Sequence, residues 1–239
     1  MDEMWKNIFK IIAIFIIGMV GGIFADQIFW PYFVERPLFY QYRLEKAPIY
    51  VTERKEIFIQ ENVALTEAIE KVKNSVVFVQ SKSKTGKILE GSGLILTSDG
   101  LVLTSADLVP QNYEVKLFFD NKEFTPKVLQ RKNDLALLKI EEKNLRTISF
   151  ADFEKTKLGE RVFLLGVVFE DNLQKMIVNE GIIKTFDENF IQTNISEDKN
   201  LQGSSLFNIE GQLVGLNTID KEGKIVAISI KEIREFIGF

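Results

Sequence analysis

The sequence contains neither histidine nor cysteine, and these two absences limit the chemistry that its side chains can do. Without histidine, the chain lacks the commonest general base, the commonest transition-metal ligand and any Ser-His-Asp or Cys-His catalytic pair. Without cysteine, it has no disulfide, no thiolate nucleophile and no cysteine-ligated zinc site. Chemistry is left to carboxylates, lysines, hydroxyls and amides, and we expect no metal centre and no cofactor.

The charge balance argues against a nucleic-acid partner. Thirty Lys and Arg residues stand against 34 Asp and Glu residues, which gives a net charge of −4 and an isoelectric point near 5.2. Binding to nucleic acid needs a basic excess that neutralises phosphates. The length of 239 residues suits one domain, or one domain with an appendage.

An apolar segment near the N-terminus predicts a transmembrane helix. No charged residue occurs between Ile11 and Ala25, and the apolar character extends over residues 8–30. Crossing a bilayer takes about 20 mostly apolar residues, which this segment supplies if Lys10 snorkels and Asp26 lies at the far interface. A cleaved signal peptide and a buried helix of a soluble domain are the alternatives. The segment ends without the small-x-small pattern that a signal peptidase prefers, which favours an uncleaved anchor.

The charges around this helix predict its orientation. Lys6 and Lys10 lie on its N-terminal side, so residues 1–30 are predicted to form a cytoplasmic stub and a single-pass anchor in the cell membrane, with the main domain outside the cytoplasm. Gly18 and Gly22 form a GxxxG pattern, a candidate face for pairing two such helices.

A linker is predicted between the anchor and the domain. Residues 31–61 hold three of the five prolines and a run of mixed charges, without sustained periodicity. Behind Asn62, a residue type that caps helices, Leu65, Ile69 and Val72 recur at helical spacing. A short helix therefore begins the domain, which we place at residues 62–239.

Short β runs separated by turn residues dominate the rest of the chain. Such runs at regular spacing indicate an all-β sandwich or barrels. A closing helix is predicted over 230–239, where apolar residues return at helical spacing. The predicted strands are Ser75–Gln80, Gly91–Thr97, Leu101–Thr104, Glu114–Phe119, Phe124–Gln130, Leu135–Ile140, Arg161–Val167, Ile177–Lys184, Phe190–Asn194, Leu206–Asn208, Gln212–Asn217 and Lys224–Ser229.

Four stretches in this order resemble the chymotrypsin-fold serine proteases of the HtrA (Deg) branch. They are Gly91–Thr104, Asn133–Ile140, Leu158–Glu160 and Gly203–Thr218. The resemblance covers about residues 62–239 and leaves nothing after Phe239 for the PDZ domain that many relatives append. It implies an all-β fold of two six-stranded antiparallel barrels with the active site between them, and short helices at both ends of the domain.

The resemblance also assigns the catalytic positions. The family's general base is the histidine of a Thr-Asn-x-His-Val motif, and Asp107 stands in its place. Asp134 matches the orienting aspartate, within the sequence Asp-Leu-Ala. The nucleophile motif Gly-Asn-Ser-Gly-Gly-Pro-Leu aligns with residues 200–206, where Gln202 replaces the serine. A carboxylate is a much weaker base than imidazole and an amide is no nucleophile, so we expect essentially no peptidase activity.

The oxyanion hole and a displaced nucleophile come from the same loop. Asn200 and Gln202 stand where the family's oxyanion-hole N–H groups lie, but the family's glycine is missing at 200, so a preformed hole is not expected. Ser204 or Ser205 could act as a displaced nucleophile with a lysine such as Lys199 as its base. The alternative is that both serines fill the tight turn where the family has glycine and proline.

The two aspartates offer a second way to rescue activity. Asp107 and Asp134 could form a paired-carboxylate site or bind a hard cation. The alternative, which we prefer, is that they are two polar residues beside a cleft.

The sequence therefore predicts a membrane-anchored, HtrA-like pseudoprotease. Its expected partners are an extended polypeptide or an envelope protein, bound as an added strand at the β edge near Gln212–Thr218. An active serine-type endopeptidase with non-standard residues is one alternative. A structural assembly subunit, homo-oligomeric through its membrane helix, is another.

Overall fold

The computed structural model describes residues 2–35, 63–170, 173–197, 199–220 and 224–238. Two compact units are present, Met1–Phe58 and Ile59–Phe239, and each is described by itself. Asn62 and most of the predicted linker, residues 36–61, lie outside the described residues.

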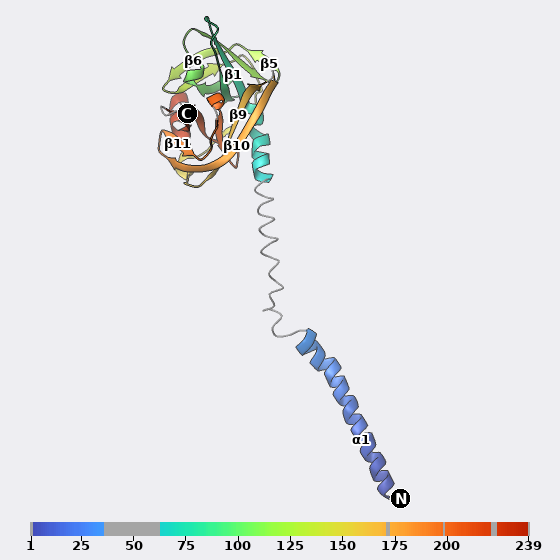
Figure 1. The fold of residues 1–239 in the computed structure, drawn as a ribbon. Coiled ribbons are helices and arrows are strands. Elements are labelled where there is room, and N and C mark those ends of the chain that lie inside the picture. Colours follow the sequence, from blue (N-terminus) through green and yellow to red (C-terminus); the bar gives the residue numbers. More distant parts are fainter. Residues whose placement is uncertain (1, 36–62, 171–172, 198, 221–223, 239) are drawn as a thin grey trace. The chain divides into compact units, whose positions relative to one another are not determined.

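The described part of the N-terminal unit, residues 2–35, is a long helix. The α-helix α1 (Asp2–Phe24) continues into the π-helical segment η1 (Ala25–Glu35) (Figure 1). Within it, Glu3–Trp30 is long and apolar enough to cross a membrane, and none of it is buried. The predicted span of residues 8–30 falls inside this segment. Residues 31–35, which the sequence placed in the linker, continue the helix instead.

The described part of the second unit begins with a helix over 63–72, which is followed by two sheets of mainly antiparallel strands. The first sheet has the strand order β5-β4-β1-β2-β3-β7-β6. Its strands are β1 (Val76–Ser83), β2 (Ile88–Ile95), β3 (Leu101–Ser105), β4 (Tyr113–Phe119), β5 (Lys122–Phe124), β6 (Lys127–Lys132) and β7 (Leu135–Lys139).

This first sheet is a half-barrel, whereas the sequence predicted a closed barrel. No pairing among the described residues joins β6 to β5, the two end strands. The run predicted as one strand, Phe124–Gln130, is divided between β5 and β6 at Thr125 and Pro126. Proline has no N–H to donate to a ladder, so the strand cannot continue through this point.

The second sheet closes into a six-stranded barrel. Its order is β12-β9-β10-β11-β14-β13-β8, and an additional pairing of β12 with β13 completes the ring. The predicted strands of this half are present, but β8 was not foreseen, and β9 and β10 extend beyond their predicted ends. The strands are β8 (Ser149–Phe150), β9 (Arg161–Glu170), β10 (Leu173–Phe186), β11 (Phe190–Thr193), β12 (Ser205–Asn208), β13 (Gln212–Ile219) and β14 (Ile225–Ser229).

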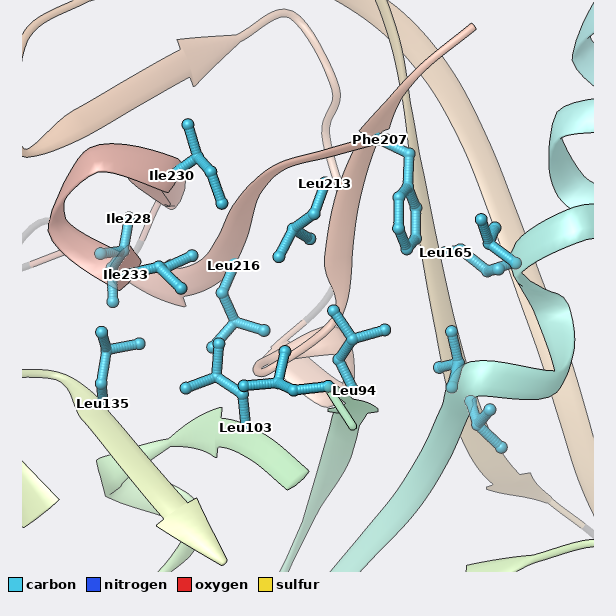
Figure 2. Close-up of a cluster of buried hydrophobic side chains, with 14 of the residues drawn as sticks. Leu94, Leu103, Leu135, Leu165, Phe207, Leu213, Leu216, Ile228, Ile230 and Ile233 are labelled. Carbon is cyan, nitrogen blue, oxygen red and sulfur yellow. The ribbon is translucent and has the colours of Figure 1, made fainter. Parts of the chain in front are cut away.

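The largest apolar cluster joins the two sheets. Leu94 and Leu103 of the first sheet and Leu216 of the second are completely buried in it (Figure 2). The predicted closing helix is α3 (Ile230–Ile237), which buries Ile230 and Ile233 in the same cluster. Because this core lies between the sheets, it fixes the loops of one sheet against the loops of the other.

Candidate functional site

The loop over 199–204, between β11 and β12, is held against the first sheet by main-chain hydrogen bonds. Ser92 N of β2 donates to Gln202 O at 2.9 Å, and Gly203 N donates to Asn217 O of β13 at 2.8 Å. A short 3-10 helix, η7 (Lys199–Leu201), precedes these contacts. The loop is therefore fixed by strands from both sheets.

Two glycines allow this close approach. Gly203 has a φ of 76°, and a Cβ at this position would collide with Ser92 O. A Cβ on Gly91 would lie 2.5 Å from Gln202 O. Any larger residue at either position would push the loop away from β2, because backbone atoms occupy the space.

The side chain of Gln202 links this loop to the residues after β3. Its Nε2 donates to Asp107 Oδ2 and to Ser105 Oγ, both at 3.0 Å. Asp107 lies in the 3-10 helix η5 (Ala106–Leu108) and is exposed, whereas Ser105 is completely buried. The structure therefore brings two of the predicted site residues into contact. Ser105 was not predicted, although it stands at the asparagine position of the motif that identified Asp107.

This contact has a clear chemical meaning. A carboxylate beside a serine hydroxyl could at least accept its proton, but an amide N–H holds its proton far too strongly to become a nucleophile. Two amide hydrogens and two acceptors match in number, so the group is satisfied as a structural link. The arrangement orders the loop against the residues that follow β3.

Asp134 lies beside this group but does not join it. Its carbonyl oxygen accepts from Ala106 N at 2.9 Å, and its exposed side chain lines a separate hollow of about 230 Å³ with Asn133 and Glu232. Asn133 Nδ2 donates to Glu232 Oε1 at 2.9 Å across this hollow. Within the described ranges, no group of three or more acidic residues is placed to hold a metal ion.

The two serines that follow Gln202 are inaccessible. Ser204 and Ser205 are both 0% exposed. Asn217 N donates to Ser204 O and Asn217 Nδ2 donates to Ser204 Oγ, while Ser205 Oγ has no hydrogen-bond partner among the described atoms. A displaced nucleophile must contact its substrate, so this burial favours the alternative in which both serines fill the turn. Asn200, by contrast, is exposed at the start of the loop.

The predicted peptide-binding edge is shorter than expected. Leu213 and Leu216 of β13 both pair with partners in other strands, and Gly215–Ile219 pair with β14. Asn217 is bonded to the 203–204 backbone on its other side. Only Thr218 and Ile219, past these contacts, keep one side without a described partner strand.

A charged contact fixes the turn between β2 and β3. Lys139 Nζ of β7 lies 2.7 Å from Asp99 Oδ2, and the Thr97 hydroxyl also donates to Asp99. These two donors, the lysine first, lower the pKa of Asp99 from 3.8 to about 2. The turn is thereby tied to the strand that follows Asp134.

The half-barrel and the closed barrel pack face to face, and the 199–204 loop, which carries the nucleophile position, lies between them. This arrangement defines a trypsin-like fold. Residues 91–216 match the family of trypsin-like peptidase domains, and the chain belongs to this family.

Curated relatives place the chain near the HtrA branch. A probable periplasmic serine endoprotease, DegP-like, of Pseudomonas putida is 38% identical over 92 residues, which cover 36% of this chain and 19% of that protein. The periplasmic pH-dependent serine endoprotease DegQ of Escherichia coli is 32% identical over 108 residues, covering 41% and 24%. The matched part is thus about a fifth to a quarter of each relative.

Solved structures agree with the fold. The serine endoprotease from Yersinia pestis superposes with a TM-score of 0.64 at 27% identity, covering 73% of this chain and 65% of that one. The HtrA-type protease AlgW with a tripeptide has a TM-score of 0.63 at 22% identity, covering 73% and 62%. The chain is therefore an HtrA-type, trypsin-fold domain preceded by an apolar helix.

Proposed function

We propose that this protein is a membrane-anchored pseudoprotease, which binds extended polypeptide outside the cytoplasm and does not hydrolyse it. The observation that carries the proposal is the hydrogen bond from Gln202 Nε2 to Asp107 Oδ2. These residues occupy the positions of the nucleophile and the general base, and in this chain they bind each other.

The remaining groups support the loss of hydrolysis. Acyl transfer by serine needs a hydroxyl within reach of a base that is neutral near pH 7. The chain has no histidine at all, and Ser204 and Ser205 are 0% exposed. The active-endopeptidase alternative would require one of these serines to leave the core.

The site architecture supports binding of an extended chain. Peptides commonly add as a strand to an open sheet edge, where main-chain hydrogen bonds give affinity. Thr218 and Ile219 offer such an edge beside the Gln202 loop. A protein of the same fold, AlgW, is known with a tripeptide.

The apolar helix supports the location. Glu3–Trp30 could serve as a signal anchor, and the DegP-like relatives are named as periplasmic. With Lys6 and Lys10 on the cytoplasmic side, the trypsin-like domain would face the extracytoplasmic space.

A peptidase assay on the full chain in detergent tests the catalytic half. We expect no cleavage of a fluorogenic unfolded protein from acid to alkaline pH, with or without Ca²⁺, Mg²⁺ or Mn²⁺. Cleavage that disappears in Ser204→Ala, but persists in the matched exposed-serine control Ser98→Ala, would establish the endopeptidase alternative instead.

A binding assay on the same preparation tests the other half. Labelled extended peptides should bind the wild-type chain, and Ile219→Pro should weaken binding because proline removes an edge N–H. Ile209→Pro, in the turn after β12, is the matched control, and circular dichroism checks that both variants fold. If no peptide in a broad array binds the wild-type chain, the polypeptide-binding function is refuted. The result would then favour the alternative of a structural assembly subunit.

A further inference from the structure

In the hairpin of β9 and β10, the first half of β10 pairs with β9 on one side and has no described strand on the other. Ten residue pairs join the two strands, from Arg161 opposite Ile182 to Glu170 opposite Leu173. On its other side β10 pairs with β11 only from Ile183 to Phe186 (Figure 1). No described strand pairs with the outer edge of residues 173–180.

The main-chain groups of this edge point outward at alternate residues. Ile182 N donates to the Asn194 side chain at 2.7 Å, and Ile182 O accepts from Asn194 N, so residue 182 directs both groups away from β9. In an antiparallel strand this direction repeats every second residue. Gln174, Met176 and Val178 therefore present their N–H and C=O groups to the outer edge, as does Glu180.

The chain that follows β11 does not cover this edge. A Cβ at Gly181 would meet Asn194 and Ile195, and Asn179 Nδ2 donates to Glu197 at 2.7 Å. Residues 179 and 181 face the inside of the barrel, since their partners Leu164 and Val162 belong to its core. Residues 195–197 thus lie on the inner face, and no strand among the described residues runs along the edge.

The edge has few of the features that normally prevent pairing. Proteins protect exposed edges with proline, bulges or charged side chains, above all lysine. Residues 173–180 contain no proline, and the register with β9 is unbroken. The ammonium group of Lys175 lies 2.6 Å from Glu170 in its own hairpin. Leu173, Met176 and Val178 are exposed by 64%, 43% and 41%.

We propose that this edge pairs with the same edge of a second copy of the chain, antiparallel, about a two-fold axis at Ile177. The resulting contact would join the two β9–β10 hairpins into one continuous sheet. It is an additional interaction surface and does not depend on the proposed function.

The sequence of the edge selects a second copy as the partner. A two-fold contact requires a surface that complements itself. About Ile177 the pattern reads the same in both directions, with Met176 opposite Val178, Lys175 opposite Asn179, and Gln174 opposite Glu180. Every pair is apolar with apolar or polar with polar, and outward main-chain groups face outward groups.

Neighbouring registers are poorer. An axis at Met176 would place Lys175 opposite Ile177 and Gln174 opposite Val178. An axis at Val178 would place Met176 opposite Glu180. Each of these sets an apolar side chain against a polar one, which forfeits cross-strand packing.

Single-cysteine crosslinking of the full chain in membranes tests this register. The chain has no cysteine, so Ile177→Cys introduces a unique thiol. Residue 177 of one copy would lie opposite residue 177 of the other copy, in a pair of the non-hydrogen-bonded type. In such pairs the two Cα atoms are about 4.5 Å apart, and a disulfide can form. Lys184→Cys is the control, because residue 184 lies in the part of β10 that is covered by β11. We expect a covalent dimer with Ile177→Cys and not with Lys184→Cys; equal yields would refute the register.

A mass measurement in detergent tests the contact without cysteine. Light scattering should show a dimer whose dissociation constant rises by about tenfold or more in Met176→Lys, because two like charges enter one small interface. Leu158→Lys, at a more exposed apolar site outside the edge, should leave the dimer unchanged. A monomeric wild-type chain, or a dimer that survives Met176→Lys and is lost in Gly18→Leu, would overturn the proposal. So would a chain that remains monomeric while its edge captures a foreign extended peptide.

Discussion

At the residue scale, the side-chain amide of Gln202 joins two loops that are far apart in the sequence. Its two hydrogen bonds connect the 199–204 loop to Ser105, which is buried, and to Asp107, which is exposed. A buried hydroxyl without a partner is costly, so the hydrogen bond from Gln202 to Ser105 stabilises the site. The side chains at positions 107 and 202 complement each other as acceptor and donor.

Gln202→Ala should lower the free energy of unfolding by about 1 kcal/mol, because Ser105 and Asp107 lose a shared donor. Urea unfolding of the full chain in detergent measures this, with Gln192→Ala, an exposed glutamine of β11, as the control. In a double-mutant cycle, Asp107→Ala should cost less in the Gln202→Ala background than in the wild type. Full additivity of the two substitutions would contradict the link.

The Asp99–Lys139 contact predicts a pH dependence. The pKa of Asp99 is lowered from 3.8 to about 2, so its contribution to stability is fully present above pH 3.8 and is lost as the pH falls through about 2. Asp99→Asn should therefore be less stable than the wild type near neutral pH, and the two should converge below pH 2. Urea midpoints at several pH values test this, and a difference that persists at the lowest pH would contradict it.

At the element scale, the half-barrel and the long hairpin depart most from what the sequence predicts. Strand existence follows from apolar runs between turn residues, and the predicted strands are present. The closure of a sheet depends on which strands pair, and no described pairing joins β5 to β6, although only Thr125 and Pro126 separate these strands in the chain. The polar residues of β10 hide its length, because they interrupt the apolar pattern from which a strand is predicted.

The glycine in the site loop gives a test at this scale. Gly203→Ala should lower the free energy of unfolding by at least about 3 kcal/mol, since the added Cβ collides with backbone at a positive φ. Gly159→Ala is the matched control, with a φ of 79° and nothing within 4 Å of an added Cβ. It should cost only about 1 kcal/mol, from backbone strain alone. Similar losses in the two variants would refute the close approach of loop and β2.

At the scale of the whole molecule, one chain combines an exposed apolar helix with a β-sheet unit that has a core of its own. The described helix of the first unit exposes apolar side chains along its length, whereas the second unit buries its own in the core between two sheets. A helix that is apolar on all sides is expected in lipid. The trypsin-like unit needs no contribution from α1 to its core.

Deletion of residues 2–30 should move the protein from the membrane fraction to the soluble fraction. Alkaline carbonate extraction checks this, because it releases peripheral proteins and retains spanning ones. Replacement of the segment by a polyleucine helix of equal length is the control and should restore membrane retention. A wild-type chain found soluble, and shortened by about the length of the segment, would instead support the cleaved signal peptide.

The sequence by itself determined the missing chemistry, the apolar helix and the order of the trypsin-like motifs, because composition and short-range pattern carry all three. Residues such as Asp107 and Gln202 were found through motifs that are continuous in the chain. Only the tertiary structure decided that these two bind each other, that Ser204 and Ser205 are buried, and that Asp134 stands apart. Those facts depend on how two sheets pack, and packing joins residues that are nearly a hundred positions apart in the sequence.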